Sequence, residues 1–350
     1  MSWTKQELKT VVLRTAGLFL IALIVFEVAM DLLRPSPDAP DAALGWKLKQ
    51  DYHRVFTQRT LDGRKYLADF WTNAEGFRTF GTNDQAPIRI LVLGDSFTAD
   101  PYGANDQMWY GKMAERLALH LHRPASDIYV LAGGGGGWGT YQELLLSRQI
   151  ARKVKPNLFV LQFCSNDFLN NSLDWESQST NRSQWMRRPF LNPRTGRNEF
   201  AHGVMPALYR TFLGETRLFT RIDGAIAGMQ FKKYGGYVKP LPAEVEAKYE
   251  RDSVALTERL LAMLRQEYAR TPAVTVNCDG DQTGPNARWK SLARNAGFVP
   301  IGGPSDFLRV AKLHHRGDVF NEDGAHLSNM GDQLYGAIAG DELASLGLIH

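Results

Sequence analysis

Apolar runs and amphipathic stretches alternate along the chain from residue 86 to near its end. Each apolar run is bounded by glycine, proline or polar residues and has the length of a strand buried on both faces of a sheet. The runs lie at 88–93, 127–131, 157–163 and 273–277, with a shorter one at 298–301. Helical patterns occupy 108–121, 141–154, 242–268 and 330–344. This alternation predicts an α/β fold, a doubly wound parallel sheet in three layers with helices on both faces.

The longest apolar stretch lies near the N-terminus, at 15–33, and is interrupted by Glu27 and Asp31. It approaches the ~20 residues that a helix needs to cross a bilayer. Three basic residues precede it and acidic residues follow, which predicts a cytoplasmic N-terminus and an external remainder. A cleaved signal peptide is the alternative. Because no small-x-small cleavage site follows the run, an uncleaved transmembrane anchor in the inner or plasma membrane is favoured.

Residues 35–85 connect this segment to the first buried strand. Their first part is rich in proline and acidic residues, which predicts a semi-rigid spacer. Their second part carries many aromatic residues, which predicts a packed extension of the domain that follows. The predicted organisation is therefore an anchor at 1–34, a spacer and extension at 35–85, and a catalytic-type domain at 86–350 with an insert at about 168–240.

Composition limits the classes of partner and cofactor. The 350 residues carry a formal net charge of +4, which is too small and too evenly spread to indicate nucleic-acid binding. Histidines and carboxylates show no metal-site spacing, so we expect neither a metal nor another cofactor. The two cysteines, Cys164 and Cys278, follow strands that are expected to be neighbours. Free buried thiols are the default expectation for them, and a disulfide is the alternative.

Ser96 follows the first buried strand directly, in the sequence Gly-Asp-Ser-Phe-Thr. A serine there lies at the carboxyl end of a parallel strand, where open α/β sheets place their ligand sites. It also lies near a helix N-terminus, which favours a developing negative charge. These are suitable surroundings for a nucleophile. The alternative is a serine that only caps the helix.

Three further groups are expected at the same edge of the sheet or beside it. Five consecutive glycines, 133–137, follow the second strand and can present backbone N–H groups to a ligand; no Gly-Lys-Ser/Thr follows, as a phosphate-binding loop requires. Asn166 follows the third strand. Near the C-terminus, Asp323 lies three residues before His326, a spacing that lets the carboxylate reach Nδ1 and leaves Nε2 to face a serine. The alternative, which this motif taken alone favours, is a helix-capping turn with an exposed histidine.

Together, GDSFT at 94–98, GWGT at 137–140, SND at 165–167 and DGAH at 323–326 resemble the four ordered blocks of the SGNH (GDSL-like) hydrolases. The resemblance covers residues 86–345 and implies a catalytic triad of Ser96, Asp323 and His326. It also implies an oxyanion hole formed by the N–H groups of Ser96 and Gly137 and the amide of Asn166. Gly134 is the alternative to Gly137. Two positions depart from the family pattern: Ala132 or Gly133 replaces an asparagine, and Cys164 replaces a glycine.

The insert carries arginines and tryptophans, of which Trp185, Arg187 and Arg188 are the candidate substrate contacts. Such residues suit an anionic, sugar-containing substrate. A solvated surface loop and a patch against anionic lipid headgroups are the alternatives.

The resulting prediction is a serine esterase that removes acyl groups, acetyl above all, from a carbohydrate or polysaccharide through an acyl-enzyme. The predicted domain lies in the periplasm or outside the cell. An O-acetyltransferase with the same triad is one alternative, and a catalytically silent carbohydrate-binding module is another. The sequence does not indicate an oligomeric state.

Overall fold

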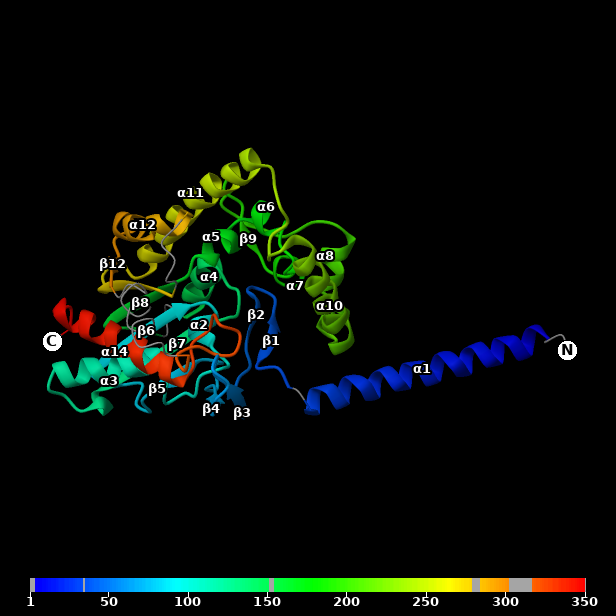
Figure 1. Cartoon of the computed structure of the whole chain (residues 1–350), viewed down its shortest axis with the longest axis horizontal. Coiled ribbons are helices and arrows are strands. Elements are labelled where there is room, and N and C mark those ends of the chain that lie inside the picture. Colours follow the sequence, from blue (N-terminus) through cyan, green and yellow to red (C-terminus); the bar gives the residue numbers. More distant parts are fainter. Residues whose placement is uncertain (1–3, 34, 151–153, 279–283, 302–316, 350) are drawn as a thin grey trace.

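The computed structural model describes residues 4–33, 35–150, 154–278, 284–301 and 317–349 (Figure 1). Its centre is a six-stranded sheet in the order β12-β11-β8-β6-β7-β5 within these residues. The strands are β5 (Arg78–Phe80), β6 (Ile88–Gly94), β7 (Ile128–Gly134), β8 (Leu158–Phe163), β11 (Ala273–Asn277) and β12 (Val299–Pro300). All neighbours are parallel except β5, which pairs antiparallel with β7 at one edge. The predicted α/β class and parallel sheet are therefore confirmed.

Side chains alternate between the two faces of the sheet and give it two apolar cores. Ile90 and Val92 of β6 join the core formed with α3 (Trp109–His120) and α14 (Asn329–Ser345). Leu91 and Leu93 join the opposite core. That second core is covered by α4 (Thr140–Ile150), α11 (Ala243–Glu267) and α12 (Trp289–Ala296). Strands that are apolar on both sides are thus buried between two helical layers, as the continuous apolar runs predict.

The predicted strands and long helices agree with the structure to within a few residues. Two short 3-10 helices, Ala125–Asp127 and Gly284–Arg288, precede β7 and α12. Strand β5 was not predicted, because three residues in an aromatic-rich segment give no periodic signal. It extends the main sheet with residues from the N-terminal extension.

The segment predicted as a spacer is ordered against the domain, so that prediction is wrong. Strand β1 (Asp38–Asp41) pairs antiparallel with β2 (Gly45–Leu48). The Asp41 carboxylate accepts hydrogen bonds from the N–H groups of Ala43 and Leu44 and closes the turn between the strands. Leu44 is buried in the core beneath this turn. The apolar residues after the proline-rich part therefore hold the whole segment in place. A second hairpin follows, formed by β3 (His53–Arg59) and β4 (Lys65–Trp71).

The insert forms a helical layer beside the sheet, on the side of the molecule from which the N-terminal helix projects (Figure 1). Its helices are α5 (Asn166–Asn171), α6 (Leu173–Glu176), α7 (Arg182–Trp185), α8 (Val204–Tyr209), α9 (Phe212–Glu215) and α10 (Arg217–Tyr234). The insert also contains a hairpin, in which β9 (Phe190–Leu191) pairs antiparallel with β10 (Asn198–Glu199). Gly196 in its turn has a φ of 70°, a conformation that glycine adopts without strain.

Helix α1 (Lys5–Leu33) extends away from the domain with no buried residue (Figure 1). Among the described residues it alone is long and apolar enough to cross a membrane, a property that signal sequences share. The Glu27 carboxylate accepts hydrogen bonds from the N–H groups of Arg217 and Leu218 at 2.6 and 2.8 Å. The acidic residue that interrupts the apolar run therefore caps the first turn of α10.

Candidate active site

Ser96 begins the short helix α2 (Ser96–Ala99) immediately after β6. The N-cap of this helix is Asp95, whose carboxylate accepts the Phe97 N–H at 3.0 Å. The cap is thus supplied by the preceding residue, and the Ser96 hydroxyl is engaged elsewhere. The alternative in which Ser96 only caps the helix is therefore wrong.

The Ser96 hydroxyl contacts a histidine that is 230 residues away in the sequence. Ser96 Oγ lies 2.9 Å from His326 Nε2, and His326 Nδ1 lies 2.7 Å from Asp323 Oδ2. Asp323 Oδ1 also accepts the backbone N–H groups of Ala325 and His326, at 2.9 and 3.0 Å. The carboxylate is thus fixed within its own turn and holds the imidazole so that Nε2 points at the serine. This is the arrangement that a serine nucleophile and a histidine base require.

The electrostatics of this chain favour a charged histidine and a charged carboxylate. Burial alone lowers the pKa of His326, but the hydrogen bond that its ring donates to Asp323 and the charges of Asp100, Asp323 and Asp95 outweigh burial and raise it. Burial raises the pKa of Asp323, yet hydrogen bonds from the His326 ring and from the N–H groups of Ala325 and His326 lower it to about 2. Asp323 is therefore ionised at neutral pH and stabilises an imidazolium at His326.

Two aromatic rings flank the His326 ring, with centroid distances of 5.0 Å to Phe97 and 5.1 Å to Tyr102. Tyr102 belongs to the segment 99–105, whose backbone is hydrogen-bonded to the side chain of Arg78 of β5. The Arg78 side chain is fully buried and donates to the backbone carbonyls of Ala99, Asp100 and Gly103. Sequence reasoning did not identify Arg78, since its partners lie more than twenty residues further along the chain.

The loop that carries Asp323 and His326 is attached to the β3–β4 hairpin. The Leu61 N–H donates to the Phe320 carbonyl at 2.9 Å, and Asn321 Nδ2 donates to the Tyr66 hydroxyl at 3.0 Å. These contacts join residues some 255 positions apart. The aromatic-rich extension, to which the sequence assigned no role beyond packing, therefore anchors the histidine loop.

Asn166 lies on the other side of Ser96, at the first position of α5. Its Nδ2 donates to Asp95 Oδ2 at 3.0 Å, so the amide is tied to the residue that precedes the serine. Asp95 is itself 1% exposed. An amide nitrogen has two N–H donors, and one remains for a ligand at the serine. The structure thus brings Asn166 to the sheet edge beside Ser96; its role in an oxyanion hole stays a prediction.

The two candidate glycines occupy different positions. Gly134 is the last residue of β7 and pairs with Gly94 of β6; a Cβ there would lie 2.7 Å from the Asp95 carbonyl oxygen. Gly137 lies in the loop beyond, with a φ of 71°, and its carbonyl accepts from Asn170 Nδ2 at 2.7 Å and from the Arg188 guanidinium. Gly134 thus allows two strand ends to approach closely. Gly137 stays the predicted oxyanion donor, in a loop that the insert fastens.

The structure corrects the prediction for Arg188. Its side chain is fully buried and paired with the buried carboxylate of Glu176. The Arg188 guanidinium also donates to the Gly137 carbonyl. Because this hydrogen bond and the ion pair with Glu176 are both inside the protein, Arg188 positions the glycine loop and does not face a substrate. Arg187 is partly exposed and pairs with Glu215, and it lines a cavity of about 370 Å³ that adjoins the glycine loop at Gly136.

Trp185 and the cysteines complete the set of predicted residues. The Trp185 ring is half-buried, and no described residue accepts a hydrogen bond from its indole nitrogen. Cys164 and Cys278 form a disulfide, with Cα atoms 5.2 Å apart. The default expectation of free thiols is therefore wrong. The pairing of β8 with β11 sets Phe163 opposite Asn277 and so places the next residue of each strand side by side. The bridge ties down the backbone just before Asn166.

Within the described residues, no three histidine, cysteine or acidic side chains are grouped as a metal site would require.

No family model matches the chain, and no curated protein matches it. Solved structures with a similar fold include a GDSL-like lipase from Parabacteroides merdae, at 14% identity and a TM-score of 0.39, covering 77% of this chain and 100% of that one. A family 3 carbohydrate esterase from Clostridium thermocellum is 14% identical with a TM-score of 0.40 and coverages of 74% and 96%. An acetyl xylan esterase from Butyrivibrio proteoclasticus is 12% identical with a TM-score of 0.36 and coverages of 82% and 68%. Such distant likenesses assign neither a family nor an activity to this chain.

Proposed function

We propose that the protein is a serine-dependent ester hydrolase. The observation that carries the proposal is the continuous hydrogen-bonded chain from Ser96 Oγ through His326 to Asp323, at 2.9 and 2.7 Å. A structural role does not require this arrangement, because Asp95 already caps α2 and the histidine loop is held by its own contacts with the hairpin.

The reaction follows from the positions of the groups. His326 Nε2 takes the hydroxyl proton as Ser96 Oγ attacks the ester carbonyl carbon, and the carbonyl oxygen becomes an oxyanion. The N–H groups of Ser96 and Gly137 and the free amide N–H of Asn166 stabilise that oxyanion. The C–O bond to the alcohol then breaks and the alcohol leaves with the proton from His326. Water repeats the sequence on the acyl-enzyme and releases the carboxylic acid.

We infer that the substrate is an acylated carbohydrate, with acetyl as the acyl group. The cavity beside the glycine loop supports this substrate class. It is lined by Gln184, Arg187 and Trp46 and also by carboxylates and further basic side chains, and it has the size of a few sugar units at most. The carboxylates are those of Asp31, Asp38 and Glu215. Arg187 is the candidate contact for an acidic sugar, since its side chain is 14% exposed and lines this cavity, where it pairs with Glu215.

We further propose that α1 anchors the protein in the inner or plasma membrane, with the domain in the periplasm or outside the cell. The basic residues before the apolar run support this orientation. The Cys164–Cys278 disulfide also supports it, because such bonds persist in oxidising compartments.

The activity is tested with the full-length protein in detergent, by acetate release from p-nitrophenyl acetate and from acetylated xylan, alongside Ser96→Ala. We expect release by the wild-type chain only. Equal release by both proteins would refute the proposal. Adding deacetylated oligosaccharide as an acceptor distinguishes the transferase: acetyl groups would then appear on the acceptor faster than free acetate appears in solution.

The substrate contact is tested with Arg187→Gln, compared with Arg194→Gln in the exposed hairpin turn. We expect Arg187→Gln to lower kcat/KM on an acetylated acidic polysaccharide and to spare p-nitrophenyl acetate. The Arg194 variant should match the wild type on both substrates. Equal losses on both substrates in Arg187→Gln would show that Arg187 supports the loop and does not contact the polymer.

A further inference from the structure

The segment 204–239, which contains α8, α9 and α10, combines exposed apolar side chains with a basic net charge. Large apolar side chains are exposed along it: Phe212 at 78%, Met229 at 64% and Ile222 at 54%. Ile222, Ala225 and Met229 follow helical spacing and so share one stripe of α10, and all three are exposed. Such a stripe on a helix would ordinarily be buried against a partner.

The same segment is basic. It contains six basic and two acidic residues, a net charge of +4 that equals the formal net charge of all 350 residues. Both acidic side chains are already neutralised by arginines outside the segment, Glu215 by Arg187 and Asp223 by Arg182. The exposed basic side chains include Arg221, Lys232 and Lys233, which lie on α10 beside the apolar stripe.

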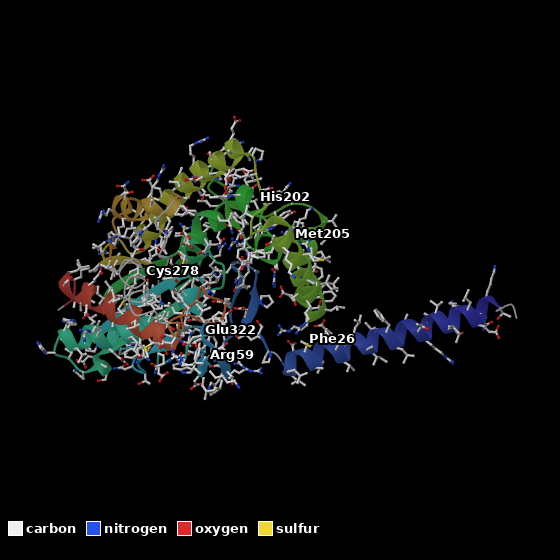
Figure 2. All side chains as sticks on the ribbon, in the orientation of Figure 1. Phe26, Arg59, His202, Met205, Cys278 and Glu322 are labelled. Carbon is white, nitrogen blue, oxygen red and sulfur yellow. A yellow bond between two sulfur atoms is a disulfide. The ribbon has the colours of Figure 1, made fainter. Side chains whose placement is uncertain are left out.

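The position of α10 relative to α1 is fixed by specific contacts. Glu27 caps the start of α10, and Arg217 Nε donates to Asp31 Oδ1 at 2.7 Å. Helix α10 therefore begins beside the end of the apolar run of α1. The insert lies on the side of the domain from which α1 projects, and Met205 and Phe26 both lie on that side in Figure 2.

We propose that the exposed face of α8–α10 rests on an anionic lipid surface, the one that α1 enters. Apolar side chains flanked by arginine and lysine are the composition of a surface that inserts at the headgroup level and attracts anionic lipids. The contacts between α1 and α10 hold this surface at the height where the apolar run ends. The proposal rests on α1 being a membrane anchor and is independent of the esterase activity.

The test uses the full-length protein in lipid nanodiscs with single added cysteines carrying a nitroxide. Because Cys164 and Cys278 are bonded to each other, an added cysteine is the only reactive thiol. The variants are Ile222→Cys on α10, Leu18→Cys on α1, and Leu119→Cys on α3, an equally exposed apolar position elsewhere on the domain. The measurement is the accessibility of each label to oxygen, which concentrates in lipid, relative to a water-soluble nickel complex.

In nanodiscs that contain phosphatidylglycerol, we expect the ratio of oxygen to nickel accessibility to be high at 18, intermediate at 222 and low at 119. A high ratio at 18 with equal ratios at 222 and 119 would overturn the proposal and leave the anchor intact. Low accessibility to both reagents at 222 would also overturn it, because a protein partner would then cover the stripe.

Charge is tested by adding Lys232→Glu and Lys233→Glu to the Ile222→Cys protein. The ratio at 222 should fall in nanodiscs containing phosphatidylglycerol and stay unchanged in nanodiscs of phosphatidylcholine alone. An unchanged ratio in both would overturn the part of the proposal that assigns the surface to anionic lipid.

Discussion

Ser96 and Asn166 lie at the carboxyl ends of β6 and β8, whereas Asp323 and His326 lie in a loop outside the sheet. The first pair is fixed by the sheet itself: the two strands are neighbours, and Asn166 bonds to the residue before Ser96. The position of the second pair depends on residues far away in the sequence, because the loop is hydrogen-bonded to Leu61 and Tyr66 of the β3–β4 hairpin.

This difference separates two requirements of the site. The proposed nucleophile and oxyanion donors need a rigid edge, and the buried parallel strands supply it through their own pairing. The histidine needs a fixed distance to a serine 230 residues away. Its loop is held by Val319 and Leu327, which are buried in the core on either side of it, and by the contacts with the β3–β4 hairpin of the N-terminal extension. Ser96 and Asn166 thus form a sheet-edge half of the site, and Asp323 and His326 form a histidine half.

The largest effect tests whether the two halves act as one unit. Ser96→Ala and His326→Ala should each lower kcat on p-nitrophenyl acetate by up to about 10⁶-fold, and the double variant should lose no more than either alone. Far-UV circular dichroism should stay unchanged, since both side chains lie at the site and outside the core clusters. Additive losses would mean that Ser96 and His326 act separately.

At the sheet edge, Asn166→Ala should lower kcat by about 10²–10³-fold, as the loss of one oxyanion donor does. KM should change little, because the contact forms chiefly in the transition state. Asn295→Ala, at an exposed position of α12, is the matched control and should retain full activity. A raised KM with unchanged kcat would place Asn166 in substrate binding instead.

The sheet-edge half also contains the disulfide. Replacing Cys164 and Cys278 with serine should lower the free energy of unfolding by about 2–4 kcal/mol, because the bridge closes a long loop. Guanidinium titration of the two proteins measures the difference. An unchanged midpoint would show that the paired strands hold this region without the covalent bond.

The hydrogen bond between Asn321 and Tyr66 of the β3–β4 hairpin is tested with a Tyr→Phe substitution, made at Tyr66 and, as a control, at a tyrosine in another region. Tyr66→Phe removes the acceptor of the Asn321 amide, a contact worth about 0.5–1.5 kcal/mol, so kcat should fall by up to about tenfold. Tyr249→Phe, a half-buried tyrosine of α11, should stay within about twofold of the wild type. Identical kcat values for the two variants would remove the hairpin from the account of the site.

The pH profile concerns the histidine half alone. The base works as a neutral imidazole, so kcat/KM should rise with pH through a limb whose midpoint lies above the ordinary ~6.5, because the pKa of His326 is raised. Asp323→Asn should move that midpoint down.

The contribution of His326 to the free energy of unfolding changes with pH in the opposite direction to kcat/KM. Its folded-state pKa is above the unfolded value, so this contribution is complete below the unfolded pKa and is lost as pH rises through the folded one. In the pH profile of kcat/KM, a limb with its midpoint below the ordinary ~6.5 would contradict the raised pKa that Asp323, Asp100 and Asp95 give to His326.

The sequence predicted the sheet-edge half well, and the reason is local. A buried strand followed by glycine and a polar residue is readable within ten positions, so Ser96, the glycine loop and Asn166 were placed at the correct edge. Asp323 and His326 were assigned through the resemblance of the four ordered blocks, since their spacing of three alone is equally typical of a helix-capping turn with an exposed histidine. What the sequence did not reveal is how that turn reaches Ser96.

The errors concern interactions between distant residues. Arg188 was expected on the surface, but Glu176 neutralises it within the insert and allows it to be buried. The proline-rich segment was expected to be a semi-rigid spacer, but it pairs with β2, and the buried side chains of Leu44 and Trp46 hold the pair to the domain. Arg78 gave no signal at all, since its role consists of bonds to backbone carbonyls of a later loop. One sequence carries no record of such pairings.

The central claim is that Ser96 is a nucleophile activated by His326. Incubating the full-length protein with a fluorophosphonate and mapping the adduct by mass spectrometry tests it most directly. We predict a single adduct on Ser96, formed at a rate that follows the rising pH limb and falls sharply in His326→Ala. Absence of an adduct at Ser96, or equal labelling rates in the wild type and in His326→Ala, would contradict the account.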